Sequence, residues 1–199
     1  MIIRLAFFSA DDLPKDLTET LDALPFGEDD RARLRSIKND ASLRHSVAAR
    51  MALLALCPDG DRTIVRGEQE KPRFCVGGMP HFSLSHAGGL SVAAVSDEPC
   101  GVDLEAFRAS LDTKALADRF FSDKDREALR SHGDFFALWT KKEATVKCLG
   151  TSLSELLGKD LALPTRTYRK ENFTLSLAAE HEFSVEFQEP HFPLQEVFL

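Results

Sequence analysis

Residues that can do chemistry are concentrated between Trp139 and Gly150. Trp139, Glu143 and Lys147 follow one another at intervals of four, so a helix places an indole, a carboxylate and an ammonium group on one face. Gly150 then supplies the end of the helix. An acid flanked by amines suits a phosphate that is held by a metal ion. The alternative is a surface helix with an ordinary Glu–Lys pair, which helicity and charge alone would favour.

A second acidic element lies about forty residues upstream, in the segment 101–105 with the sequence GVDLE. Its alternation predicts a strand that pairs as a hairpin with the apolar run 90–95, across the turn-like residues 96–99. Residues two apart on a strand point to the same side, so Asp103 and Glu105 share one face. Neighbouring carboxylates repel each other unless a proton or a cation relieves them, and Mg²⁺ accepts carboxylate oxygens. The alternative is a solvated strand face at a sheet edge.

A third block precedes these two and consists of Lys71-Pro72 followed by the sequence FSLSH at 82–86. In this order, the three blocks resemble the signatures of the 4′-phosphopantetheinyl transferases, in particular the larger, Sfp-type members. Each block alone is weak, whereas the ordered set, which covers roughly positions 67 to 150, is specific. The chain departs from the pattern at two positions. Ser83 stands where Asn is usual and Ala87 where Ser is usual, which puts in doubt only minor hydrogen bonds near the ligand.

The resemblance implies an α+β fold, a pseudo-twofold pair of similar halves that each pack a small antiparallel sheet with helices. We place the division at residue 102, with the nucleotide contacts of coenzyme A in residues 1–102 and the metal site and signature helix in residues 103–199. Sequence patterns predict helices near 29–37, 41–57, 122–129 and 134–149, and strands near 2–8, 62–66, 73–76, 81–84, 90–95, 100–106, 172–178 and 182–188.

The resemblance also implies a reaction. The family transfers 4′-phosphopantetheine from coenzyme A to a serine of an apo acyl or peptidyl carrier protein and releases 3′,5′-ADP, with Mg²⁺ or Mn²⁺ as the metal. Such carriers serve fatty-acid, polyketide and nonribosomal peptide synthesis. A serine hydroxyl that attacks a diphosphate requires a cation to neutralise charge, a base for the proton, and donors for the leaving phosphate.

The positions that match the motif receive these roles by the resemblance. Asp103, Glu105 and Glu143 are expected to hold the metal, directly or through water. Glu143 is also the candidate general base, and it forms the catalytic set with Asp103 and Lys147. Lys142 and Lys147 are expected to contact phosphate oxygens, and Asp103 to contact coenzyme A as well. The alternative for Lys142 is an exposed surface lysine.

The nucleotide end of coenzyme A is expected to meet residues of the first half. Ser85 and His86 are expected at a phosphate, and Lys71 at the adenosine or its phosphate. The planar fork of Arg44 is expected at the 3′-phosphate. Arg50 follows six positions later and points about 120° away around the helix, so it either joins this site or braces the structure.

The amino-acid composition indicates which kinds of molecule the protein is expected to bind. A net charge of −7 argues against nucleic acid as the main partner, whereas residues 31–50 carry six basic residues against one acidic residue, a local charge of +5 that suits an anionic ligand. The chain shows no apolar run of the roughly 18 residues that span a membrane. Four cysteines without metal-ligand spacing suit a reducing cytoplasm. By analogy, the two-half length indicates a monomer.

Two other function classes stay open at this point. One is a homologue that binds coenzyme A without transfer and acts as a regulatory module; the retained carboxylates and Lys147 argue against it. The other is an unrelated Mg²⁺-dependent phosphohydrolase that shares the acidic pair. The remaining histidines show no pattern that lifts them above surface or core positions: His45, His81, His132, His181 and His191.

Overall fold

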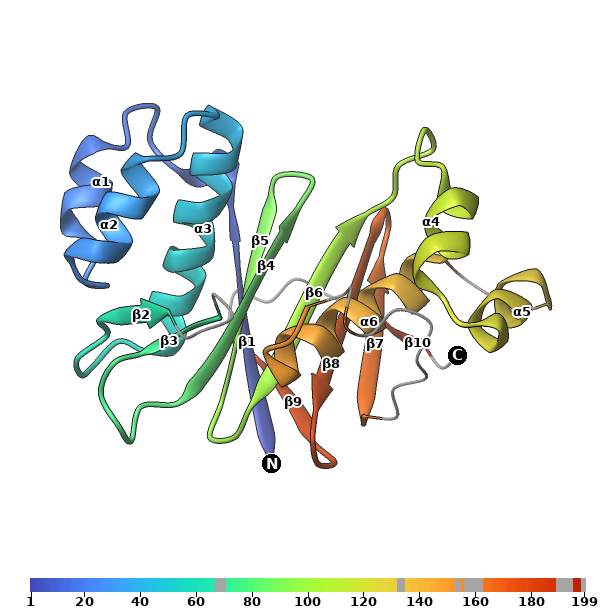
Figure 1. The fold of residues 1–199 in the computed structure, drawn as a ribbon. Coiled ribbons are helices and arrows are strands. Elements are labelled where there is room, and N and C mark those ends of the chain that lie inside the picture. The colour runs from blue at the N-terminus through green and yellow to red at the C-terminus, as the bar shows by residue number, and fades with distance from the viewer. Residues whose placement is uncertain (67–70, 132–134, 153–154, 156–162, 189–194, 198–199) are drawn as a thin grey trace.

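The computed structural model describes residues 1–66, 71–131, 135–152, 155, 163–188 and 195–197. Two four-stranded sheets stand next to each other, each with one long helix packed on it (Figure 1). The predicted α+β class is therefore confirmed.

The two halves repeat one order of elements. The first half runs through strand β1 (Ile2–Ser9), helix α3 (Asp40–Leu56) and the hairpin of β4 (His81–Ala87) and β5 (Leu90–Ser96). Its sheet has the order β4-β5-β1. The second half has the same order, β7-β8-β6, from the following elements: β6 (Cys100–Ala106), α6 (Phe135–Leu149), β7 (Thr165–Lys170) and β8 (Phe173–Ala179). This repetition gives the pseudo-twofold pair that the resemblance implied.

One additional strand extends each sheet. Strand β9 (Ser184–Phe187) pairs in parallel with β1, so the first sheet is mixed and includes chain from the C-terminal part. Strand β10 (Gln195–Val197) pairs with β7 in the second sheet. The division that we placed at residue 102 falls inside β6, which belongs entirely to the second sheet. Smaller elements complete the described chain: a 3₁₀ turn η1 (Ala10–Asp12), α1 (Thr18–Ala23), α2 (Glu28–Arg35), β2 (Ile64–Arg66), β3 (Pro72–Phe74), α4 (Thr113–Phe120) and α5 (Asp123–Ser131).

Apolar side chains hold α3 to the outer face of the first sheet. Val47 is fully buried, and Leu43, Met51 and Leu54 pack around it at the spacing that predicted an amphipathic helix. A second apolar cluster, which contains Leu5, Val102 and Leu177 among others, is shared by strands of both sheets. The sheets therefore form one core with each other, and the helices cover the faces that remain.

The predicted start of one helix and the predicted end of another are confirmed. At the start of α5, Ser122 and Asp125 form a capping box in which the Ser122 Oγ accepts from the Asp125 amide at 3.1 Å and the Asp125 carboxylate accepts from the Ser122 amide at 3.3 Å. Helix α6 ends at Gly150, whose φ of 67° is the left-handed conformation that glycine adopts most easily. Residue 134, the predicted start of that helix, lies outside the described residues.

Candidate active site

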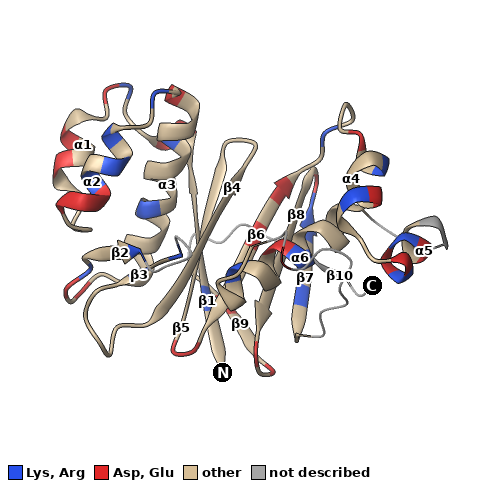
Figure 2. Ribbon diagram, in the orientation of Figure 1, with Lys and Arg blue, Asp and Glu red and all other residues tan. Residues whose placement is uncertain are grey.

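A close backbone contact brings helix α6 onto strand β6. A Cβ atom added at Gly101 would lie 1.9 Å from the carbonyl oxygen of Ala144 and 2.6 Å from the amide nitrogen of Cys148. Only glycine permits this approach, because both of those atoms belong to the helix backbone. Asp103 and Glu105 lie on the same face of the strand as Gly101, so they face α6. Figure 2 shows charged positions of both signs where α6 crosses β6.

Three residues from three elements meet at the carboxylate of Asp103, which is buried with 5% of its surface exposed. Its Oδ1 accepts from the Lys147 ammonium at 2.7 Å and from the Ser85 hydroxyl at 3.0 Å. The Lys147 Nζ also lies 3.1 Å from the Ser85 Oγ. The structure thus joins residues of β4, β6 and α6 that the sequence analysis assigned to one site.

The second oxygen of Asp103 is left open. Its Oδ2 is buried and accepts no hydrogen bond from the described residues. A buried acceptor without a donor costs about 1–3 kcal/mol, which makes this atom a position where a further positive group would be favourable.

Two glutamates share the surroundings of Asp103. Burial raises the pKa of both Glu105 and Glu143, and the negative charge of Asp103 raises each pKa further. The Lys147 ammonium opposes these effects at both carboxyl groups. The three carboxylates are therefore close enough to repel one another, as the sequence analysis expected of a metal site.

Glu105 has two further partners that lower its pKa. The guanidinium of Arg108 lies 3.2 Å from its Oε2, and Trp139 hydrogen-bonds to its side chain. Trp139 also stacks on Phe135 at a centroid distance of 5.7 Å, so it both anchors α6 and contacts the acidic cluster.

These donors fit Mg²⁺ when a phosphate supplies the remaining ligands. In the part of the chain that the structure describes, no three His, Cys, Asp or Glu side chains are grouped closely enough to hold a metal by themselves. Mg²⁺ is ordinarily bound by one or two carboxylates together with substrate phosphates and water. The open Oδ2 of Asp103 is one such carboxylate oxygen, and Glu105 and Glu143 are close enough for the charge of Asp103 to raise their pKa values.

The structure does not bring Lys142 to this cluster. Its Nζ lies 2.7 Å from the Asp125 carboxylate and 5.6 Å from the ring centroid of Phe121. Successive residues of an α-helix are rotated by about 100° around its axis, so Lys142 points away from the face that carries Glu143. Lys142 thus ties α6 to α5, and its expected phosphate contact is not supported by this arrangement.

Lys71 and Lys147 line the same cavity of about 200 Å³, together with Pro72, Ser83 and Gly150 among others. The Lys71 ammonium donates to the Cys148 carbonyl at 2.7 Å, near the end of α6. Burial lowers the pKa of Lys71, which makes an anionic partner more favourable there. Two lysines that were expected to contact coenzyme A therefore line one cavity.

His86 lies beside a histidine that the sequence analysis did not select. The ring centroids of His45 and His86 are 5.0 Å apart and the ring planes are tilted by 39°. Burial lowers the pKa of His86, and His45 and Lys147 lower it further. Alternation along β4 could have revealed this pair, because Phe82, Leu84 and His86 share the strand face that α3 covers.

The guanidinium group of Arg44 is engaged in hydrogen bonds to backbone carbonyls. It donates to the carbonyls of Pro14 and Ala10, each at 2.9 Å, and of Leu13 at 2.8 Å. A phosphate contact would compete with these three hydrogen bonds, so the structure does not support the expected position at the 3′-phosphate.

Arg50 pairs with Asp30 inside the protein. Its Nε and one terminal nitrogen donate to the two oxygens of Asp30 at 3.0 and 2.6 Å, and the two residues are only 5% and 3% exposed. This bidentate pair links α3 to α2 and matches the bracing alternative that the sequence analysis left open for Arg50.

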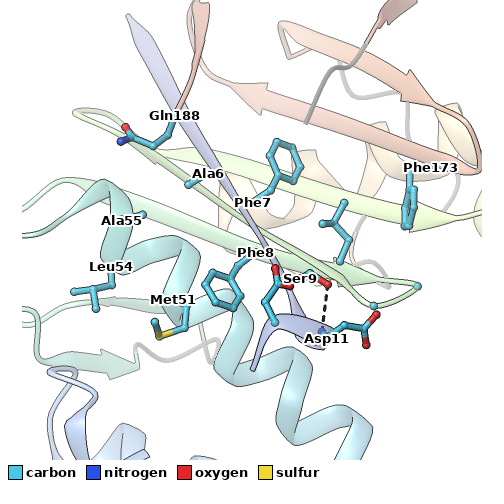
Figure 3. A pocket seen from close by; sticks show the side chains of 14 residues that line it. Ala6, Phe7, Phe8, Ser9, Asp11, Met51, Leu54, Ala55, Phe173 and Gln188 are labelled. Carbon is cyan, nitrogen blue, oxygen red and sulfur yellow. Dashed lines mark hydrogen bonds between the residues drawn. The ribbon is translucent and has the colours of Figure 1, made fainter. Parts of the chain in front are cut away.

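A separate cavity lies elsewhere in the described part of the chain. It measures about 830 Å³ and is lined mainly by apolar side chains, among them Phe7, Phe8, Met51, Leu54 and Phe173 (Figure 3). The residues predicted for catalysis, metal or coenzyme A do not line it. Size alone would make it the default site, but the titratable groups meet at Asp103 instead.

The cysteines carry no reactive thiolate at this site. Burial raises the pKa of Cys100 to about 12 and that of Cys148 to about 11, so both thiols stay protonated at neutral pH. Cys57 is also buried, whereas Cys75 is exposed. Across the described ranges, the helices are all too short or too polar to cross a membrane.

Comparisons with known proteins agree with the sequence resemblance. A family model described as the 4′-phosphopantetheinyl transferase superfamily matches residues 99–197, which include β6 and α6. The chain is 37% identical to the 4′-phosphopantetheinyl transferase AcpT of Salmonella typhimurium over 109 residues, 51% of this chain and 57% of that protein. Identity to the 4′-phosphopantetheinyl transferase Sfp of Bacillus subtilis is 29% over 145 residues, 67% of this chain and 57% of that protein.

A third relative is matched over more of its length. The AcpT protein of Escherichia coli O157:H7 is 31% identical over 133 residues, 61% of this chain and 68% of that protein. In the first two relatives, the chain spans little more than half of the relative's length. With the ordered motifs, the repeated α+β halves and these matches, the chain belongs to the 4′-phosphopantetheinyl transferase superfamily.

Proposed function

We propose that this protein transfers the 4′-phosphopantetheine group of coenzyme A to a serine of an apo acyl or peptidyl carrier protein and releases 3′,5′-ADP, with Mg²⁺ as cofactor. One observation carries the proposal: Asp103, Lys147 and Ser85 meet within hydrogen-bond distance. The charge of Asp103 raises the pKa of both Glu105 and Glu143, and a bound cation would relieve this repulsion. The names of the relatives support the same reaction.

Coenzyme A would lie across the boundary between the two halves, where β4 and β6 lie next to each other. We place its diphosphate at Lys147 and its adenosine in the cavity that Lys71 lines. The 3′-phosphate would lie at His86, with His45 beside it, rather than at Arg44, whose donors are engaged by carbonyls. Bound Mg²⁺ would neutralise the diphosphate, and Asp103, Glu105 and Glu143 are the residues that would hold it.

The chain's own residues then account for the proton and the leaving group. The serine oxygen of the carrier forms a bond to the β-phosphorus, and the bond from that phosphorus to the bridging oxygen breaks, leaving the electron pair on 3′,5′-ADP. Glu143 takes the hydroxyl proton as the general base. Lys147, oriented by its hydrogen bond to Asp103, donates to the leaving phosphate.

Intact-mass spectrometry of a panel of apo carrier proteins, incubated with coenzyme A and Mg²⁺, tests this proposal. The expected result is a gain of one phosphopantetheine group on a serine of at least one fatty-acid, polyketide or peptide-synthetase carrier. Binding of coenzyme A without product on any carrier would favour a non-catalytic homologue. Release of inorganic phosphate from simple esters without a carrier would favour a phosphohydrolase.

The placement of the 3′-phosphate gives a separate prediction. His86→Ala is expected to weaken the binding of coenzyme A about tenfold and to leave 3′-dephospho-coenzyme A nearly unchanged, because the lost hydrogen bond reaches only the 3′-phosphate. Isothermal titration calorimetry with both ligands measures the difference. Arg44→Ala is the comparison, and it should lower the melting temperature while changing the two affinities equally. A selective loss in Arg44→Ala would instead return the 3′-phosphate to that arginine.

A further inference from the structure

The two sheets are joined by serine hydroxyls. Strands β4 and β6 are edge strands of different sheets and lie next to each other at the centre of the molecule (Figure 1). The hydroxyl of Ser83 accepts from the Val102 amide at 3.0 Å, and that of Ser85 accepts from the Leu104 amide at 3.1 Å. Side chains of β4 thus take the place that backbone carbonyls hold in a continuous sheet.

The groups that form this joint are buried. Ser83 and Ser85 are 5% and 7% exposed, and Val102 and Leu104 are 0% and 2% exposed. A buried amide without an acceptor costs free energy comparable to a lost hydrogen bond, so each hydroxyl provides what solvent cannot. The two hydroxyls therefore connect β6 to β4 by hydrogen bonds that cross from one sheet to the other.

The two amides flank Asp103 along the chain, one on each side. Ser85 uses its full capacity, since its hydroxyl donates to Asp103 and accepts from Leu104 and Lys147. Ser83 makes only the joining contact among the hydrogen bonds described here, and it contributes no group to the Asp103 cluster. It is also the position at which the sequence departs from the usual Asn, and it retains an acceptor there.

We propose that Ser83 is a positioning residue, whose hydrogen bond to the Val102 amide fixes Asp103 of one half against Ser85 of the other. The role in the structure stands on the contacts alone, whereas its effect on turnover rests on the proposed transfer function.

Two substitutions that introduce side chains of the same shape separate the effect of the hydroxyl group from the effect of side-chain volume. Ser83→Thr retains the acceptor, and Ser83→Val replaces it with a methyl group of nearly equal size. Amide hydrogen exchange of the full-length protein is measured by NMR. The Val102 amide should exchange at least about tenfold faster in Ser83→Val than in Ser83→Thr, because exposure of this amide no longer breaks a hydrogen bond. Ser91→Ala removes another fully buried hydroxyl, which donates to the His45 carbonyl, and should leave exchange at Val102 unchanged.

Turnover provides the second readout. Ser83→Val is expected to lower kcat about tenfold relative to Ser83→Thr, with the KM for coenzyme A within about twofold. A small displacement of Asp103 impairs the geometry of the transition state, while the coenzyme A contacts proposed for Lys71 and His86 remain. Equal exchange at Val102 in the two variants would overturn the proposal. A rise in KM with Val102 still protected would also overturn it, because Ser83 would then be a ligand contact in the cavity it lines. If the wild-type protein loads no carrier, the exchange comparison still decides the joint, so failure of the proposed function remains distinguishable.

Discussion

Glu143→Gln should lower the rate of carrier loading by about 100-fold or more, while the free protein becomes more resistant to heat. The loss of activity follows because glutamine can neither accept the proton of the serine hydroxyl nor contribute negative charge to the cation site. The gain in stability follows from burial and from the charges of Asp103 and Glu105, which disfavour the ionised form of Glu143 in the folded protein. Loading is measured by intact mass, and stability by thermal unfolding without ligand.

The pH dependence of this difference has a definite sign. The pKa of Glu143 is raised in the folded state above its ordinary value of 4.5, so the folded protein binds this proton more tightly than the unfolded chain does. The carboxyl group therefore favours folding below its ordinary pKa, and that contribution is lost as the pH rises through the raised pKa. The stability advantage of Glu143→Gln should accordingly be larger at neutral pH than in acid.

The control for this variant is an exposed glutamate on helix α1. Glu19→Gln makes the same chemical change on the surface of the first half. It should alter neither the loading rate nor the pH dependence of stability. Near-wild-type loading by Glu143→Gln would remove Glu143 from the catalytic set.

Gly101→Ala should destabilise the protein by about 3 kcal/mol or more, at the upper end of what overpacking costs. The added methyl group would lie 1.9 Å from the Ala144 carbonyl oxygen, and that oxygen belongs to the α6 backbone, which cannot turn aside as a flexible side chain could. The helix must move as a unit, and it carries Glu143 and Lys147 with it. Thermal unfolding should therefore show a fall of about 6–12 °C in the melting temperature, and carrier loading should fall with it at temperatures where the variant is folded.

Gly77→Ala is the matched control, because a Cβ atom at Gly77 would meet no atom within 4 Å and that glycine has an ordinary φ. It should leave both the melting temperature and the loading rate unchanged. A melting temperature of Gly101→Ala close to that of Gly77→Ala would mean that α6 does not lie against β6 as described.

Local patterns in the sequence sufficed to predict the elements that carry the site, but the predicted hairpin of 101–105 with 90–95 is wrong. Strand β5 pairs with β4 and β1, whereas β6 pairs with β8 in the other sheet. The alternation at β6, the four-residue spacing on α6 and the capping box of α5 each depend on neighbours in the chain, so they can be read without the fold. Strand β7 was missed because its sequence TRTYRK has one large apolar side chain, Tyr168, among charged residues. Helix α4 was likewise not anticipated.

The partners of several charged side chains could not be predicted, because they depend on contacts between residues that are far apart in the sequence. Lys142 is one residue from Glu143, and only the presence of α5 shows that it turns toward Asp125. Arg44 and His45 are also neighbours, and the loop that contains Leu13 decides that the arginine, rather than the histidine, is taken up by carbonyls. The return of β9 to the first sheet is a long-range pairing of the same kind.

Anomalous diffraction from a crystal grown with coenzyme A and Mn²⁺ tests most directly whether Asp103, Glu105 and Glu143 converge on one divalent cation. We predict a single strong Mn²⁺ peak within about 2–2.5 Å of the open oxygen of Asp103 and of the coenzyme A diphosphate, with both glutamates in its coordination sphere directly or through water. Coenzyme A bound with its diphosphate away from Asp103, or a Mn²⁺ peak at a site that these carboxylates do not reach, would contradict it.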